Sequence, residues 1–290
     1  MTKDGIPGLF TRSSVLGGEM FDLTLAKRAA VNLTAVRERK PLIHNITNYV
    51  VMNYTANALL ACGASPVMAH AEEEVEEMVS LAGALVINIG TLSSPWIESM
   101  MKAARRANQL KVPVILDPVG AGATTLRTNT CLRFIAEAYT TVIRGNASEV
   151  LSLAEKGRGT KGVDSIDTVE EAADAAVTLA RKLKRTLAIT GKVDLITDGE
   201  RIRRVYNGHE MMGRVTGTGC TATAIIGAFL AVDPDPVEAT ATALAYFGLA
   251  GEKAAAQTSA PGSYQIALLD ALYTVDGKQL EEGARIDGIR

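Results

Sequence analysis

The stretch ALVINIGTLSSPWIESMMKAARRANQLKVPVILD, residues 84–117, decides the fold class. Its two ends, 84–90 and 112–117, are short runs of β-branched and other apolar residues, which predict buried strands. Residues 93–110 between them have the apolar spacing of a helix. A strand, a helix and a second strand in this order are typical of two parallel strands joined by a helical crossover.

The same alternation continues along the chain. Residues 140–145 and 186–191 predict two more buried strands, and residues 168–184 predict a helix between them. Residues 192–208 change to two extended segments around Asp198 and Gly199, a pair that supplies the positive φ values of a tight hairpin turn. We therefore expect an α/β protein with a mostly parallel central sheet, helices on both faces and an antiparallel edge hairpin.

The C-terminal third of the chain is helical and rich in small residues. Residues 220–232 are apolar or small on all sides, so we expect this helix to be buried all round, inside the domain or against another subunit. Asp235 as N-cap, Pro236 at the first helical position and Glu238 at the third predict the start of the next helix. We expect an N-terminal extension over 1–24 and a single domain over 25–290.

The composition narrows the function classes. The chain has 290 residues, of which 47% are hydrophobic, and a formal net charge of -2, so there is no basic excess for binding nucleic acid. No run reaches about 18 apolar residues, so we expect no membrane span. The three cysteines are far apart and fit neither a disulfide framework nor a metal site, which favours a reducing cytoplasm. Small molecules are the expected partners.

Polar residues follow three of the predicted parallel strands, where open α/β sheets bind ligands. Asp117 ends one strand and suits magnesium held through water, although it could instead cap the following turn. Arg144 at the next strand end is a candidate for a polyphosphate. Glu149 lies three residues after Asn146, which is nearly a capping box, so either capping or metal binding explains it. Thr190 ends a further strand and is a weaker nucleotide candidate.

The segment GTGCTA, residues 217–222, formally matches the dinucleotide fingerprint G-x-G-x-x-A. It fits that motif poorly, because no strong buried strand precedes it and no βαβ unit surrounds it. Gly217, Thr218 and Gly219 instead leave free amides at a helix N-terminus, where they would stabilise a phosphate or a moving phosphoryl group. Cys220 in that field is either a reactive thiolate or an ordinary small core residue, and composition alone favours the core.

Five blocks of the sequence together carry a family resemblance. They are PLIHNITNYVVMNYTANALLACGASPVMAHA (41–71), ILDPVGAGATTLR (115–127), IRGNASEVLSLA (143–154), AITGKVD (188–194) and VTGTGCTATAIIGAFLA (215–231). From about residue 25 to about residue 275 the chain resembles hydroxyethylthiazole kinase, the thiazole-salvage enzyme of thiamine biosynthesis. The resemblance implies a ribokinase-like fold, a homotrimer with active sites at subunit interfaces, and phosphorylation of 4-methyl-5-(2-hydroxyethyl)thiazole by ATP with Mg²⁺.

The resemblance also assigns roles to the nucleotide side of the site. It implies that Arg144 and Thr190 contact ATP, and that Glu149 and Asp117 organise magnesium and its waters. Related sugar and vitamin kinases carry an aspartate general base after their glycine turn, and the thiazole kinases are similar to this chain in carrying a cysteine there. Cys220 thus takes the base position beside the turn formed by residues 217–219.

The substrate side rests on fewer residues. The resemblance implies that Met68 and Gly217 contact the thiazole, whereas a lone methionine is otherwise usually core filling. Asn48 and His44 lie in a loop that we expect to face the pocket, and bracing of that loop is the alternative. His70 and His209 have no partner at metal-binding spacing.

Two other function classes compete with the thiazole kinase. One is a related pyrimidine or pyridoxal kinase or a hydrate-repair lyase, against which Cys220 in place of aspartate argues. The other is a binding protein without turnover, against which the retained Asp117, Arg144, Glu149 and glycine turn argue. For the kinase we expect an in-line transfer, in which the amides of residues 217–220 stabilise the γ-phosphoryl group and Cys220 orients or deprotonates the alcohol.

Overall fold

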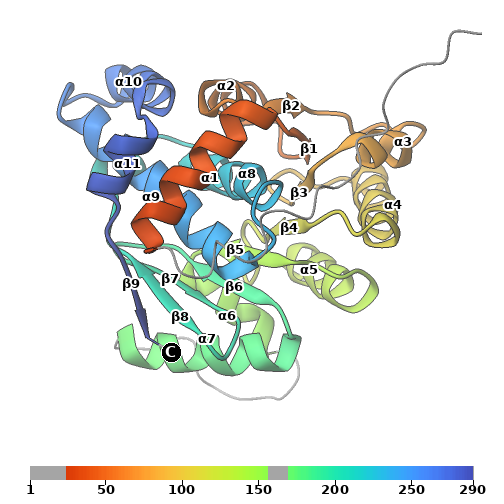
Figure 1. Cartoon of the computed structure of the whole chain (residues 1–290). Helices are drawn as coiled ribbons and strands as arrows, with labels where there is room; N and C mark the ends of the chain where they lie inside the picture. Colours follow the sequence, from red (N-terminus) through yellow and green to blue (C-terminus); the bar gives the residue numbers. More distant parts are fainter. Residues whose placement is uncertain (1–23, 156–168, 290) are drawn as a thin grey trace, which may run out of the picture.

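In the described part of the chain, residues 24–155 and 169–289 of the computed structural model, nine strands form one sheet in the order β2-β1-β3-β4-β5-β6-β7-β8-β9 (Figure 1). The strands are β1 (Leu42–Ile46), β2 (Ser65–Val67), β3 (Ala84–Asn88), β4 (Val114–Asp117), β5 (Val142–Gly145), β6 (Thr186–Ile189), β7 (Asp194–Thr197), β8 (Ile202–Val205) and β9 (Ile286–Ile289). All four strands predicted between residues 84 and 191 are present.

The first six strands of the chain are mutually parallel, as expected. The register of β3 and β4 pairs Asn88 with Asp117, and that of β5 and β6 pairs Arg144 with Ala188. Because parallel strands end at the same edge of a sheet, this register brings polar residues from neighbouring strands together at the carboxyl edge.

The edge beyond β6 is antiparallel, which confirms the predicted hairpin and corrects its turn. Thr197 pairs with Ile202, so the loop has four residues and only Gly199 takes a positive φ, 96°. The Oδ1 atom of Asp198 accepts hydrogen bonds from the amides of Glu200 (2.9 Å) and Arg201 (2.8 Å). Aspartate therefore acts here as an acceptor that closes the loop, instead of adopting a left-handed conformation itself. The outermost strand, β9, was not predicted.

Helices cover both faces of the sheet, as predicted (Figure 1). One face packs on α1 (Leu25–Arg39), α2 (Met52–Cys62), α8 (Thr218–Leu230), α9 (Pro236–Ala255), α10 (Pro261–Thr274) and α11 (Gly277–Gly283). The other face packs on α3 (Val75–Leu81), α4 (Ser94–Leu110), α5 (Thr125–Glu137), α6 (Ala147–Glu155) and α7 (Val169–Leu183). A short 3₁₀ helix, η2 (Glu210–Arg214), precedes α8.

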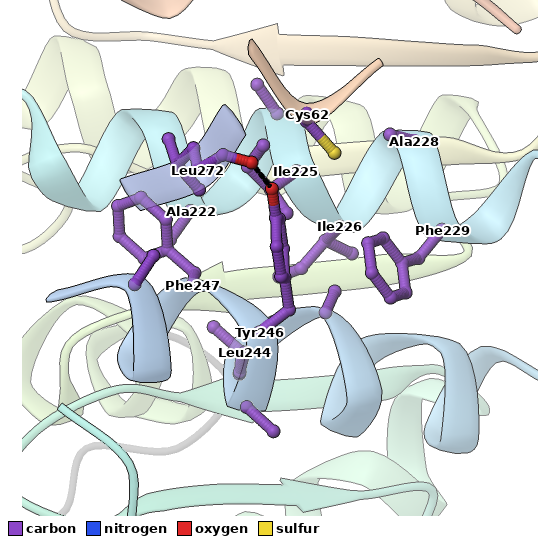
Figure 2. Close-up of a cluster of buried hydrophobic side chains, with 14 of the residues drawn as sticks. Cys62, Ala222, Ile225, Ile226, Ala228, Phe229, Leu244, Tyr246, Phe247 and Leu272 are labelled. Carbon is purple, nitrogen blue, oxygen red and sulfur yellow. Dashed lines mark hydrogen bonds between the residues drawn. The ribbon is translucent and has the colours of Figure 1, made fainter. Parts of the chain in front are cut away.

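Helix α8 is surrounded on all sides, which confirms the expectation from its composition. Every residue from Thr221 to Leu230 is buried. A Cβ on Gly227 would lie 3.1 Å from a methyl of Val86, so this glycine lets the helix approach the sheet closely. Figure 2 shows the opposite side of α8 against α9, where the hydroxyl of Tyr246 donates a hydrogen bond to the carbonyl of Leu272. Packing within the chain accounts for this burial.

The predicted start of α9 is confirmed. The side chain of Asp235 accepts hydrogen bonds from the amides of Val237 (3.0 Å) and Glu238 (3.3 Å), and Pro236 is the first helical residue. The Glu238 side chain pairs instead with Arg203, at 2.7 Å.

The chain before α1 is described only from Thr24, whose hydroxyl caps that helix by accepting a hydrogen bond from the amide of Lys27 (3.3 Å). The rest of the expected extension, residues 1–23, lies outside the described residues. None of the described helices is both long and apolar enough to cross a membrane.

Candidate active site

The candidate residues from strands β4 to β6 meet the start of α8 at the carboxyl edge of the sheet. Asp117 is the last residue of β4, Arg144 lies in β5, and Thr190 directly follows β6. Cys220 lies in the first turn of α8. Sheet register and helix position together gather residues that are far apart in the sequence.

Asp117 is buried within this group. Its Oδ2 atom accepts hydrogen bonds from Asn88 Nδ2 and Thr223 Oγ1, each at 2.8 Å, and lies 3.8 Å from Nη1 of Arg144. Burial raises the pKa of Asp117 to about 6, although Arg144 and the two hydrogen bonds act in the opposite direction. These partners come from three other elements, so the structure does not support Asp117 as a cap of the following turn.

Arg144 joins Asp117, Thr190 and the glycine turn. Its Nη2 atom donates to Thr190 Oγ1 at 2.5 Å, and a Cβ on Gly219 would lie 2.8 Å from its Nη1. Gly219 therefore lacks a side chain where the guanidinium passes beside the helix. The Nε atom is buried and has no hydrogen-bond partner among the described residues. This leaves a cationic group with unused hydrogen-bonding capacity at the helix N-terminus.

The glycine turn requires its first glycine for two reasons. Gly217 is the N-cap of α8 with φ 88°, and a Cβ there would lie 2.6 Å from Cγ1 of Val51. The hydroxyl of Thr218 bonds the carbonyls of Met212 (2.8 Å) and Val215 (3.2 Å), so it fixes the turn to η2. The helix begins at Thr218, and its first amides have no partner within the helix.

Cys220 fits neither of the two interpretations from the sequence, a reactive thiolate or an ordinary core residue. Burial, and then the charge of Asp117, raise the pKa of its thiol to about 11 despite hydrogen bonds to the sulfur. The raised pKa therefore favours the neutral thiol over the thiolate at neutral pH, because desolvation outweighs the hydrogen bonds to the sulfur and the charge of Arg144. Cys220 is nevertheless partly exposed, whereas Cys62 and Cys131 are buried core residues. Its Sγ accepts a hydrogen bond from Asn48 Nδ2 at 3.4 Å.

Glu149 forms the capping box that the sequence left open. The amide of Glu149 donates to Asn146 Oδ1 at 2.8 Å, and the amide of Asn146 donates to Glu149 Oε2 at 3.0 Å. Its other oxygen accepts from the amide of Gly120 at 2.8 Å, which ties the loop after Asp117 to α6. No group of three His, Cys, Asp or Glu side chains among residues 24–155 and 169–289 could hold a metal ion unaided.

The loop that carries Met68 lies at the same sheet edge, beyond β1. Met68 directly follows the edge strand β2 and is partly exposed. His44 Nε2 bonds the carbonyl of Ala69 at 2.7 Å, and burial lowers the pKa of His44, so the neutral ring donates this hydrogen bond. The loop-bracing alternative thus holds for His44. The β1 strand separates Met68 from the group around Asp117.

Residues 33–278 of the chain match the hydroxyethylthiazole kinase family. The chain belongs to this family. It is similar to the hydroxyethylthiazole kinase of Desulfotalea psychrophila, with 62% identity over 258 residues that cover 89% of this chain and 94% of the relative.

Solved structures agree with the family assignment. The hydroxyethylthiazole kinase of Pyrococcus horikoshii OT3 is 49% identical, with a TM-score of 0.84, covering 91% of this chain and 100% of that one. A ribokinase-like superfamily protein of Enterococcus faecalis V583 is 16% identical, with a TM-score of 0.58, covering 80% and 86%. The expected ribokinase-like fold is confirmed. Membership of a kinase family argues against both the hydrate-repair lyase and the binding protein without turnover.

Three residues of the site in this hydroxyethylthiazole kinase family member were missed by the sequence analysis. Asn88 and Thr223 both donate to Asp117, and Gly90 packs directly against Asn48. Asn88 is a polar residue at the end of a buried strand, as Asp117 is. The search for polar residues at strand ends that identified Asp117 would therefore also have identified Asn88. Thr223 gave no such indication, because it lies one turn into a helix of small residues.

Proposed function

We propose that this kinase transfers the γ-phosphoryl group of ATP to the hydroxyl of 4-methyl-5-(2-hydroxyethyl)thiazole, giving the thiazole phosphate used in thiamine phosphate biosynthesis. The observation that carries the proposal is the glycine turn with Cys220 and Arg144, present in a chain whose 62% identical relative bears the name of this activity.

The phosphate side of the proposal uses the cationic end of the site. The buried Nε of Arg144 has no hydrogen-bond partner in the part of the chain that the structure describes, and the guanidinium lies beside the first turn of α8. Free amides at a helix N-terminus stabilise negative charge that develops on a phosphoryl group. We infer that ATP is bound through Arg144 and Thr190, and that the amides of residues 217–220 stabilise the γ-phosphoryl group.

Magnesium fits this site through the nucleotide. Mg²⁺ is usually held by one or two carboxylates together with waters and substrate phosphates, so two carboxylates without a third ligand are sufficient. Asp117 and Glu149 would hold the ion and its waters, and the ion would supply charge neutralisation on the phosphates. Each of these carboxylates already accepts two hydrogen bonds, which orient it for that task.

On the acceptor side, the alcohol oxygen forms a bond to the γ-phosphorus while the bond to the leaving ADP oxygen breaks, and the hydroxyl proton passes to water. We infer that Met68, Gly217 and Asn48 bind the thiazole alcohol. With a pKa of about 11, Cys220 is mainly a neutral thiol, so its principal role is to orient the hydroxyl. A loose phosphoryl transition state needs little help from a base, which makes this assignment chemically sufficient.

We also propose a cytoplasmic homotrimer with the sites at subunit interfaces and one kinase domain over residues 25–290, after the extension 1–24. Tyr49 and Val50 expose 65% and 64% of their surface directly beside Asn48, so a neighbouring subunit over this loop would bury apolar area and close the site. Sedimentation equilibrium tests the assembly, and a monomer at micromolar concentration would overturn this part.

A coupled ADP-release assay tests the activity, with Mg²⁺-ATP and hydroxyethylthiazole, and with hydroxymethylpyrimidine and pyridoxal in parallel. Turnover that depends on the thiazole alcohol is the expected result. Turnover with a competitor alone would contradict the substrate assignment, and silence with all three would contradict the kinase activity.

A further inference from the structure

Two buried asparagines connect Asp117 to Cys220 in a continuous chain of hydrogen bonds. Asn88 Nδ2 donates to Asp117 Oδ2 at 2.8 Å, and Asn48 Nδ2 donates to Asn88 Oδ1 at 2.8 Å. The same Nδ2 of Asn48 donates to Cys220 Sγ at 3.4 Å. The two amides thus lie between a buried carboxylate and the group at the helix start.

The direction of this chain is fixed by groups that can only donate or only accept. The amide of Gly90 donates to Asn88 Oδ1 at 3.0 Å, so the Nδ2 of Asn88 must face the carboxylate of Asp117. The amide of Val50 donates to Asn48 Oδ1 at 3.1 Å, so the Nδ2 of Asn48 must face the sulfur. Neither asparagine can rotate its amide by half a turn without losing hydrogen bonds at both ends.

Gly90 also fixes the place of the Asn48 side chain. A Cβ on Gly90 would lie 2.7 Å from Asn48 Nδ2 and 2.8 Å from Asn48 Cβ, closer than such atoms approach one another. The φ of Gly90 is not in the left-handed region. Glycine is therefore required here by the close approach of Asn48, not by the backbone conformation.

Building on the proposed function, we infer that Asn88 is a positioning residue that holds Asn48 so that an N–H always faces position 220. An N–H donor favours a negative charge at the atom that it faces. The atom beside Asn48 would be either the sulfur or the alcohol oxygen as it loses its proton. The amide pair would therefore stabilise the anionic form of the acceptor during phosphoryl transfer.

The first experiment measures alkylation of Cys220 by iodoacetamide in the free protein, followed by peptide mass spectrometry at about pH 8, because the thiolate is the reacting form. Asn48→Asp has nearly the same size but lacks the second hydrogen that the sulfur receives. We expect alkylation to slow about tenfold or more, because the variant loses the N–H donor and places a carboxylate beside the sulfur, and both changes disfavour the thiolate. Asn57→Asp on the exposed side of α2 is the matched control, and its rate should stay unchanged.

An unchanged rate in folded Asn48→Asp would overturn the inference. If that variant does not fold, Gly90→Ala replaces it, because the added methyl must displace Asn48 while leaving both asparagines present. Gly262→Ala is the control for that substitution, since a Cβ there meets nothing within 4 Å. The alkylation test needs no substrate, so failure of the thiazole assay contradicts the proposed function without deciding this inference.

A double-mutant cycle on kcat separates positioning from simple support of the fold. We expect Asn88→Leu and Asn48→Ala each to lower kcat about tenfold or more, and the double variant to lose hardly more than the worse single variant. That non-additivity is expected because Asn88 and Asn48 form one hydrogen-bonded unit beside the sulfur, and removal of either member disrupts that unit. Losses that multiply in the double variant would show that Asn88 acts independently, and would overturn the positioning role.

Discussion

Replacement of Cys220 by aspartate is the sharpest perturbation of the proposed mechanism. With a thiol pKa of about 11, about one Cys220 in a thousand is ionised at about pH 8. A carboxyl has a much lower ordinary pKa, about 4, and although burial and the charge of Asp117 would raise it here, most of it would still be ionised at the same pH. The fraction of ionised base therefore rises about a thousandfold.

The carboxylate is also a weaker base than the thiolate, by several pKa units. A weaker base lowers the rate of the proton-transfer step, so this difference offsets much of the gain in ionised base. The two effects nearly cancel, and we expect kcat of Cys220→Asp to be unchanged or up to about tenfold higher.

The assay is ADP release at saturating ATP and hydroxyethylthiazole, measured across pH. Only the ionised carboxylate accepts a proton, so kcat of Cys220→Asp should fall as the pH drops through the pKa of the new carboxyl. Cys220→Asn is the control, because it matches aspartate in size and has no basic group. A thousandfold loss in the aspartate variant would refute the reasoning, since the thiol would then have a role that a carboxylate cannot fill.

Three further outcomes follow from the geometry. Gly217→Ala should lower the unfolding free energy by about 1–3 kcal/mol in urea titration and reduce turnover. The φ of Gly217 is 88°, and the added Cβ would collide with a valine. Gly262→Ala should have little effect. Arg144→Lys should raise the KM for ATP about tenfold or more in steady-state kinetics, since an ammonium does not reproduce the guanidinium fork; an unchanged KM would remove Arg144 from the nucleotide site. Asp233→Ala should lower the unfolding free energy by about 3–5 kcal/mol, because Arg28 would be left buried and unpaired, and a loss below about 1 kcal/mol would contradict this.

The core of the fold could be predicted from the sequence because buried parallel strands have nearly unbroken runs of apolar residues. Strands β3 to β6 follow that rule, the apolar spacing of residues 93–110 predicted helix α4, and a cap identified the start of α9. The rule fails at the edges of the sheet, where hydrogen bonding to a neighbouring strand, and not burial of apolar residues, defines the strand. The strand β9, with the sequence IDGI, is short and contains an aspartate and a glycine, and it is a strand because it pairs with β8.

The site was predictable where one residue ends one strand, as for Asp117 and Arg144. The site was not predictable where one side chain forms hydrogen bonds with two different parts of the chain. Glu149 satisfies both the capping box and the amide of Gly120, and nothing local indicates the second contact. The orientation of Asn48 depends on Gly90, about 40 residues away in the sequence, and no periodicity predicts such a contact.

The helices that cover the two faces of the sheet are synthesised at different times. Helices α3 to α7 are interleaved with the parallel strands, so one face is covered as the strands emerge. Helices α8 to α11 follow the last parallel strand in the sequence. Until they are synthesised, only α1 and α2 are available to cover the other face. A nascent chain that ends near residue 205 therefore exposes an apolar sheet surface, and translational pausing there should increase its dependence on chaperones.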